Sequence, residues 1–330
     1  MKRTSTISRL VEFGLRLIGM WPDSAYPNLY WSMTFYNIVA AVKRDWNDRV
    51  VSNSYSTMMA IANQSSRYSV VLIGLHFLTG FSLSIGAYMF RTINTDSEAS
   101  TREFPVKMQF SFVVSESPVF ECILFGQIFF LMLIAPVVGM INALLATLIL
   151  HVGGQVDIMR QAIMDVHSND KLDTSLTVLR DLIHRHRKII TLSNDIETLF
   201  SFIALLQLLW NTLIICFCGF MIILTLSSNK GIMVLIKSMF LYTVKTLEVF
   251  VFCYAGEFLS SKSKSISDAI YESLWYNMIP SDSRILLLIM VRSQKRLTIT
   301  AGKIFDLTLE GFMSVMKASA SYMSVLHAMY

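Results

Sequence analysis

Residues 119–150 read VFECILFGQIFFLMLIAPVVGMINALLATLIL, and this stretch decides the class of the protein. Its one charged residue, Glu121, lies next to the N-terminal end of the stretch. An α-helix rises about 1.5 Å per residue, so about 20 apolar residues cross the ~30 Å hydrocarbon core of a bilayer. The stretch is longer than that, and it therefore predicts a helix that crosses a membrane.

Other parts of the chain have the same apolar character. The 330 residues are 54% hydrophobic and 15% charged, whereas about a quarter of the residues in a typical soluble chain are charged. The sequence predicts an all-α membrane protein with five full spans. These spans are residues 69–90, 119–150, 199–226, 232–259 and 305–330. A sixth apolar stretch, residues 29–41, is too short to span.

The segments between the spans differ in charge. Residues 42–68, 151–198 and 260–304 are rich in Lys and Arg, whereas residues 91–118 lean acidic. The positive-inside rule places basic segments in the cytoplasm. We therefore expect 151–198 and 260–304 to form a cytoplasmic anchor region, with apolar residues at helical spacing in the first of them. The N-terminal segment 1–28 is also expected in the cytoplasm, and the C-terminus outside.

Several functional classes find little support in the sequence. The net charge is +5, but the basic residues gather between apolar runs, which indicates membrane orientation rather than nucleic-acid binding. No P-loop, GxSxG, HExxH or GxGxxG pattern occurs, so we expect no enzyme, no cofactor and no metal site. His184 and His186 lie among Arg and Lys, and we interpret them as part of a solvated basic helix face.

Ionisable residues inside an expected span indicate function by default, because burying charge in a membrane is costly. Lys245 and Glu248 are three residues apart in the span 232–259, so they are neighbours on one helix face. Two interpretations remain open. The residues form an ion pair that faces the helix bundle, or they line a water-filled cavity.

The last span carries a stripe of small and polar side chains at helical spacing. The stripe consists of Ser314, Ala318, Ser321, Val325 and Met329. A bulkier face lies opposite, made of Phe312, Met316, Met323, Leu326 and Tyr330. A stripe of small residues allows another helix to approach closely, or it lines a pore. The residues alone favour close helix packing.

Four short motifs near the C-terminus together carry a resemblance. They are AIYESLWY at residues 269–276, RSQK at 292–295, TITAG at 298–302 and ASASY at 318–322. The combination closely resembles the C-terminal signature of insect odorant receptors. Weaker similarity extends over the rest of the chain, in LIGMWP at residues 17–22, Asp45-Trp46 and Ser117-Pro118.

The resemblance implies a seven-helix subunit of a tetrameric, ligand-gated cation channel in the plasma membrane of sensory neurons. Such a channel is shared with a common co-receptor, is surrounded by lipid and detects small volatile molecules. The family's last helix lines the pore, which favours the pore interpretation of the stripe. Aligned from the C-terminus, the family's apolar gate falls on Val325 and Met329.

The resemblance also implies an odorant pocket in the outer half of the membrane, among the second, third, fourth and sixth helices of the family. Wide or polar side chains on the corresponding outer helix halves are the candidates for odorant binding. They are Ser84, Tyr88, Phe125, Phe130, Phe240 and Thr243. Each of them is equally suited to face lipid or to pack in the core.

One departure from the family pattern concerns its first two helices. The family has two full helices between its Trp-Pro and Asp-Trp motifs, whereas this chain has only residues 29–41, a remnant of the first helix. A splice form, a faulty gene model or a decayed gene would each explain the difference. Loss of two crossings preserves the topology of the later helices, but it removes one wall of the pocket and would impair ligand gating.

Three other classes of membrane protein serve as alternatives. An insect gustatory receptor shares the fold, but its usual Thr-Tyr…Gln-Phe ending is replaced here by Ser321-Tyr322…His327-Ala328. A G-protein-coupled receptor would have an extracellular N-terminus, a cysteine in an outer loop and a basic cytoplasmic tail. A secondary transporter would show internal repeats and helices broken by Gly or Pro.

Overall fold

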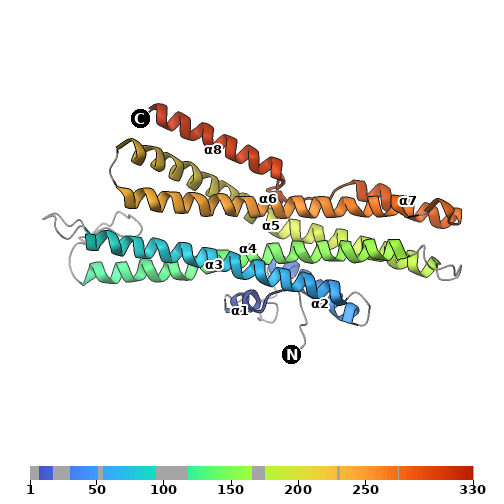
Figure 1. Ribbon diagram of the computed structural model, residues 1–330. Helices are drawn as coiled ribbons and strands as arrows, with labels where there is room; N and C mark the ends of the chain where they lie inside the picture. Colours follow the sequence, from blue (N-terminus) through green and yellow to red (C-terminus); the bar gives the residue numbers. More distant parts are fainter. Residues whose placement is uncertain are drawn as a thin grey trace.

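The computed structural model describes residues 7–17, 30–50, 55–93, 118–165, 175–228, 231–273 and 275–329. Its helices are α1 (Arg9–Leu17), α2 (Tyr30–Val50), α3 (Tyr55–Ile93), α4 (Val119–Asp165), α5 (Ser175–Ser228), α6 (Ile232–Glu272), α7 (Pro280–Gln294) and α8 (Leu309–Met329). A 3-10 turn covers Trp275–Asn277, and two short strands, β1 (Thr300–Ala301) and β2 (Phe305–Asp306), lie between α7 and α8. The long helices run alongside one another in an elongated bundle (Figure 1).

The three longest helices are much longer than a bilayer is thick. α4, α5 and α6 contain 47, 54 and 41 residues, which corresponds to about 60–80 Å at 1.5 Å per residue. The expected helical character of residues 151–198 is confirmed wherever the structure describes them, because α4 continues to Asp165 and α5 begins at Ser175.

Among the described residues, α4 and α5 each contain an apolar stretch long enough to cross a membrane by length and composition. Of the other expected spans, residues 69–90 lie within α3 and residues 232–259 lie within α6. The expected span 305–330 includes α8. Charged side chains such as Lys237, Lys245 and Glu248 make the expected span in α6 less apolar. The count of five spans therefore stays a prediction.

Residues 30–41 of the short apolar stretch are part of a longer helix than we expected. α2 continues to Val50, through Lys43, Arg44 and Asp45. No Gly or Pro interrupts the sequence between residues 41 and 50, and the Arg44 side chain donates to the Ala40 carbonyl one turn earlier (3.2 Å). The interpretation of these residues as a short fragment was therefore incomplete.

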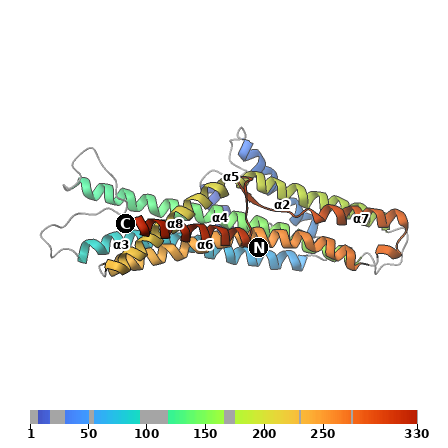
Figure 2. The same cartoon turned by 90° about the horizontal axis from the view of Figure 1, so that it is seen from above.

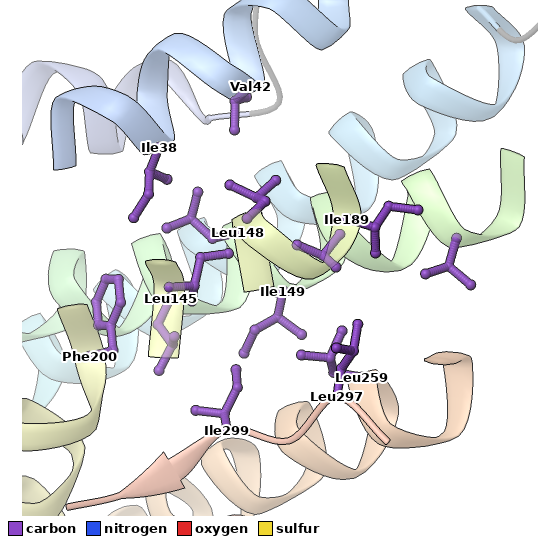
Figure 3. Packing of buried hydrophobic residues seen from close by; sticks show 14 of the residues in the cluster. Ile38, Val42, Leu145, Leu148, Ile149, Ile189, Phe200, Leu259, Leu297 and Ile299 are labelled. Atoms are coloured by element: carbon purple, nitrogen blue, oxygen red, sulfur yellow. The ribbon is translucent and has the colours of Figure 1, made fainter. Parts of the chain in front are cut away.

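Buried apolar side chains from α2, α4, α5, α6 and the segment after α7 form one core. Figure 3 shows Ile38 and Val42 of α2 close to Leu145, Leu148 and Ile149 of α4, with Ile189, Phe200, Leu259, Leu297 and Ile299 around them. Trp46 is also buried, as are Ile7 and Val11 at the beginning of the described chain. The core thus joins α2 and the segment around α1 to the bundle.

The last helix begins four residues later than the expected span 305–330. Residues 300–306 form a two-stranded antiparallel hairpin instead, in which Thr300 pairs with Asp306 and Ala301 with Phe305. Thr308 then caps α8, because its hydroxyl accepts the backbone N–H of Gly311 (3.1 Å). α7 and α8 lie toward opposite ends of the bundle (Figures 1 and 2).

Candidate functional sites in the last helix and the bundle

The two faces of α8 have different surroundings. Gly311, Val315 and Ser319 are buried against the bundle. The stripe residues Ser314, Ala318, Ser321, Val325 and Met329 are all exposed on this single chain. Of the bulkier face, Phe312, Met316 and Met323 are half-buried, Leu326 is exposed, and Tyr330 lies outside the described residues. The small and polar stripe therefore points away from its own bundle.

The exposed stripe is apolar at its C-terminal end and polar nearer the start of α8. Val325 is 56% exposed and Met329 is 82% exposed. The hydroxyl of Ser321 donates to the Lys317 carbonyl and that of Ser314 donates to the Glu310 carbonyl, each over 3.0 Å. These serines thus satisfy their hydroxyl protons within the helix, and their oxygens remain able to accept from water.

A hairpin fixes the start of α8 to α5. The backbone N–H of Gly302 donates to the Ser201 carbonyl (2.8 Å), and that of Lys303 donates to the Ser201 hydroxyl (3.1 Å). The Thr300 hydroxyl donates to the Glu197 carboxylate (2.8 Å). Gly302 and Lys303 have φ angles of 64° and 59°, as in a type I′ turn, which glycine favours. The motif TITAG thereby acquires a structural role.

α6 contacts the same region from the other side. The backbone N–H at Leu309, where α8 begins, lies 3.4 Å from the Glu257 carboxylate. One residue earlier on α6, a Cβ atom at Gly256 would overlap the carbonyl oxygen of Leu307. Glycine at this position therefore allows the backbone before α8 to lie directly on α6.

Five polar side chains from four helices form a buried network in the bundle. They are His76 of α3, Asn142 of α4, Gln207 of α5, and Lys245 and Glu248 of α6. We call this set the polar network. Glu248 is 2% exposed and Asn142 is 4% exposed. The expected ion pair is confirmed, because the Lys245 ammonium donates to Glu248 Oε2 over 2.8 Å.

Glu248 is the acceptor at the centre of the polar network. Its Oε1 atom accepts from Asn142 Nδ2 (3.1 Å) and from Gln207 Nε2 (2.5 Å). Gln207 Nε2 also donates to Asn142 Oδ1 (2.9 Å), and Asn142 Nδ2 lies 3.0 Å from His76 Nε2. A single carboxylate thus links α4, α5 and α6.

A small cavity lies beside the polar network. Its lining consists of Leu72, Asn142, Leu145, Ala146, Glu248, Val251, Phe252 and Ala255, which come from α3, α4 and α6. Its volume of about 10 Å³ is of the order that holds one water molecule. Glu248 therefore combines features of both interpretations, because it is paired within the bundle and also lines a cavity.

A second polar cluster joins α2, α4 and α5 in the expected cytoplasmic part. Asp45 accepts from His151 Nε2 (3.1 Å) and pairs with Lys188. Burial opposes the charge on Asp45, but the hydrogen bond and charge of His151 and the charge of Lys188 outweigh it, and they lower the pKa of the Asp45 carboxyl. The Asp45-Trp46 motif thus supplies one ion-pair partner and one core side chain.

The interpretation of His184 and His186 as a solvated basic face was half wrong. His184 is exposed, but His186 is 7% exposed. Burial, together with the positive charge of Arg292 on α7, lowers the pKa of His186. The difference arises because α7 packs against α5, which a helical pattern within α5 does not reveal.

The candidate odorant-binding residues are dispersed in the described structure. Phe125 and Phe130 are exposed, as is Thr243, whose hydroxyl donates to the Met239 carbonyl. Phe240 is half-buried, and Ser84 is buried with its hydroxyl donating to the Gly80 carbonyl. The side chain of Tyr88 lies outside the described residues. None of the five described side chains lines the cavity beside Glu248, and the assignment of all six stays a prediction.

Two features of the site were not predicted from the sequence. The hairpin contacts of Glu197 and Ser201 link positions about 100 residues apart, and so do the contacts of Asn142 with Glu248. The available signal was the presence of Asn142 and Gln207 in otherwise apolar stretches, because polar residues in membrane helices usually find partners.

Comparison with protein families gives one match that covers most of the chain. The family model described as "7tm Odorant receptor" matches residues 28–320. The matched region includes the polar network, the hairpin and most of α8.

Curated relatives match a shorter part of the chain. Odorant receptor 10 of Aedes albopictus is 27% identical over 165 residues, which are 50% of this chain and 43% of that protein. Putative odorant receptor 92a of Drosophila melanogaster is 28% identical over 158 residues, which are 48% of this chain and 38% of that protein. The aligned region is thus less than half the length of each relative.

Solved structures show the same fold. The insect olfactory receptor OR5 of Machilis hrabei in complex with eugenol matches with a TM-score of 0.73 at 13% sequence identity, over 97% of this chain and 88% of that chain. A second structure of the same receptor matches with a TM-score of 0.65 at 14% identity, over 96% of this chain and 87% of that chain.

Proposed function

This chain belongs to the 7tm odorant receptor family, and from that membership we propose that it is a subunit of a ligand-gated cation channel. The ligands are small volatile molecules, and the channel works in the plasma membrane of sensory neurons. Its partner is a co-receptor subunit, with which it forms a heterotetramer. In this arrangement the N-terminus is cytoplasmic and the C-terminus is extracellular.

The observation that carries this proposal is the orientation of α8. Its stripe of small and polar residues is exposed, although Val315 and Ser319 on the other side pack into the bundle. Lipid-facing helix surfaces are normally apolar and bulky, because lipid cannot hydrogen-bond to polar groups. A face with Ser314, Ala318 and Ser321 is better suited to a pore or to a neighbouring subunit.

The gate in this proposal consists of Val325 and Met329. The two residues are one helical turn apart near the end of α8, and both are exposed on the single chain. Four such helices around an axis form a narrow apolar ring, which excludes water and therefore blocks ions. A ligand that binds the open state more tightly shifts the population toward a hydrated pore.

The ligand site in this proposal remains the set Ser84, Tyr88, Phe125, Phe130, Phe240 and Thr243. Aromatic and apolar side chains suit volatile ligands, which offer few hydrogen bonds. Phe125 is 72% exposed and stacks on Phe129, with ring centroids 6.4 Å apart. This aromatic surface of α4 is therefore accessible to a ligand on the single chain.

Recording of membrane current tests the proposal. Cells that express the co-receptor with this chain, and cells that express the co-receptor alone, receive a panel of volatile alcohols, esters and aromatics. The panel includes eugenol, the ligand in the complex with the Machilis receptor. We expect the panel to evoke a cation current that depends on this chain. In the same cells, Val325→Ser is expected to raise the current without odorant several-fold, because a hydroxyl lowers the barrier to wetting.

Leu326→Ser is the matched control for the gate. It introduces the same hydroxyl at the next residue, about 100° around the helix and on the bulkier face. We expect its basal current, normalised to surface-labelled channels, to stay near that of the unmodified chain. Equal basal currents from Val325→Ser and the unmodified chain would refute the gate. Equal odorant currents with and without this chain would refute the receptor function.

A further inference from the structure

The polar network joins α5 to α6 a short distance along the bundle from the two points at which these helices hold the start of α8. Six residues before Gln207 on α5, Ser201 binds the hairpin. Nine residues after Glu248 on α6, Glu257 meets the first N–H of α8. Building on the proposed function, we propose that the hydrogen bond from Gln207 to Glu248 is a positioning link, which fixes α5 against α6 and thereby sets the resting position of α8.

The hydrogen bond from Gln207 joins the two helices at the centre of the bundle. Glu248 Oε1 accepts from the Gln207 amide, and Glu248 Oε2 accepts from Lys245 (2.8 Å) on the same helix. The negative charge is thus neutralised within α6, whereas the hydrogen bond from Glu248 to α5 depends on the Gln207 amide. Removing that amide leaves the Glu248–Lys245 pair intact, so Gln207 can be changed without exposing an unpaired charge.

Packing alone does not require such a network. Replacing a buried ion pair by apolar residues of similar volume often leaves stability unchanged or raises it. Polar groups in membrane helices instead define which helices meet and at what register. The Gln207 amide also donates to Asn142 Oδ1 (2.9 Å), so one side chain sets the register of α5 against both α4 and α6.

The contacts at the start of α8 transmit the spacing of α5 and α6. Ser201 holds the turn of the hairpin through the backbone N–H groups of Gly302 and Lys303. On α6, Gly256 touches the backbone of Leu307 just before α8. The start of α8 is thus held by α5 on one side and by α6 on the other. A change in the distance between α5 and α6 therefore moves the N-terminal end of α8.

The test replaces Gln207 by methionine, whose side chain has a similar length but cannot donate a hydrogen bond. Gln207→Met is expected to remove this hydrogen bond between α5 and α6 and thereby to lower the free energy needed to move α8. The half-maximal concentration of the most effective odorant should fall by about threefold or more, as expected for the loss of one hydrogen bond between membrane helices. The basal current per surface-labelled channel should rise in parallel. Gln207→Asn, which keeps a shorter amide, should lie between Gln207→Met and the unmodified chain.

Lys262→Met provides the matched control. Lys262 also extends from α6, but it pairs with Asp157 of α4 (2.6 and 2.8 Å) and not with α5. We expect its half-maximal concentration and basal current to stay unchanged. An unchanged odorant response of Gln207→Met, measured alongside normal currents from the unmodified chain, would overturn this inference alone.

Two further outcomes also count against the inference. If neither Gln207→Met nor Gln207→Asn reaches the surface, the amide serves assembly rather than the response. Absence of any odorant current from the unmodified chain would overturn the proposed function, and the positioning role with it.

Discussion

Two imidazoles at neighbouring positions of α5 have opposite surroundings. His184 is exposed to solvent, whereas His186 is 7% exposed and faces the positive charge of Arg292 on α7. Burial disfavours the charged imidazolium, and the nearby guanidinium disfavours it further. Both effects lower the pKa of His186 in the folded protein, so the buried ring stays neutral at a pH at which an exposed histidine takes up a proton.

The lowered pKa of His186 predicts a loss of stability in mild acid. An unfolded chain binds a proton at this histidine as the pH falls below about 6.5, whereas the folded protein does not, so the free energy of unfolding decreases in that range. The melting temperature of the detergent-solubilised protein should therefore fall less between pH 7.5 and 5.5 in His186→Gln than in the unmodified chain. His184→Gln, at an exposed position, should retain the full decrease. Equal decreases in all three proteins would contradict the prediction.

Residue periodicity within one helix predicted part of the candidate site. The stripe on α8 and the pair Lys245–Glu248 are both patterns of three or four residues along a single helix, and the structure shows the exposed face and the ion pair. The donors to Glu248 from other helices were not predictable. Asn142 lies 106 positions from Glu248 and Gln207 lies 41 positions from it, so their contacts depend on how four helices pack.

At the scale of helices, glycine determines how closely the segment before α8 approaches α6. Gly256 lies under the Leu307 carbonyl, and a methyl group at that position would overlap the carbonyl oxygen. The obstacle is backbone rather than a flexible side chain, so α6 and the hairpin would have to separate. In contrast, a Cβ atom at Gly74 of α3 would meet no atom of another helix within 4 Å.

This contrast predicts opposite results for two Gly→Ala substitutions. Gly256→Ala should destabilise the protein by about 1–3 kcal/mol, the usual cost of overpacking, and should reduce the amount that reaches the cell surface. Gly74→Ala should be neutral or should stabilise α3 by up to about 1 kcal/mol, because alanine favours a helix. Melting temperature and surface labelling measure both. A Gly256→Ala protein as stable as Gly74→Ala would show that the close approach is not maintained.

The sequence predicted the long helices well, and their ends less well. Apolar length identified the stretches inside α3 to α6 and α8, because a run of about 20 apolar residues has few alternatives. It did not show that α2 continues to Val50 or that residues 300–306 form a hairpin. Both depend on distant partners, since Asp45 of α2 pairs with His151 and Lys188, and the hairpin binds Glu197 and Ser201.

At the scale of the whole molecule, three ion pairs gather in one part of the bundle. The expected cytoplasmic part contains the ion pairs Asp45–Lys188, Arg185–Asp181 and Lys262–Asp157. All three lie in the part of the bundle that extends beyond the expected membrane spans. Such pairs need water or a polar protein environment, because charged side chains are costly inside a bilayer. The same end of the bundle carries α7 (Figures 1 and 2).

This distribution predicts the orientation of the protein in the membrane. The positive-inside rule keeps the basic segments in the cytoplasm, so α7 and the ion pairs should lie inside the cell and the end of α8 outside. An epitope tag after Thr4 and another inserted next to the exposed His184 should remain unstained in intact cells and become stained after permeabilisation. A tag after Tyr330 should be stained in both. Every tagged chain must also respond like the untagged one, because a tag that changes the fold gives no information. Staining of the Thr4 tag on intact cells would refute the orientation, and with it the assignment of Val325 and Met329 to the outer end of the pore.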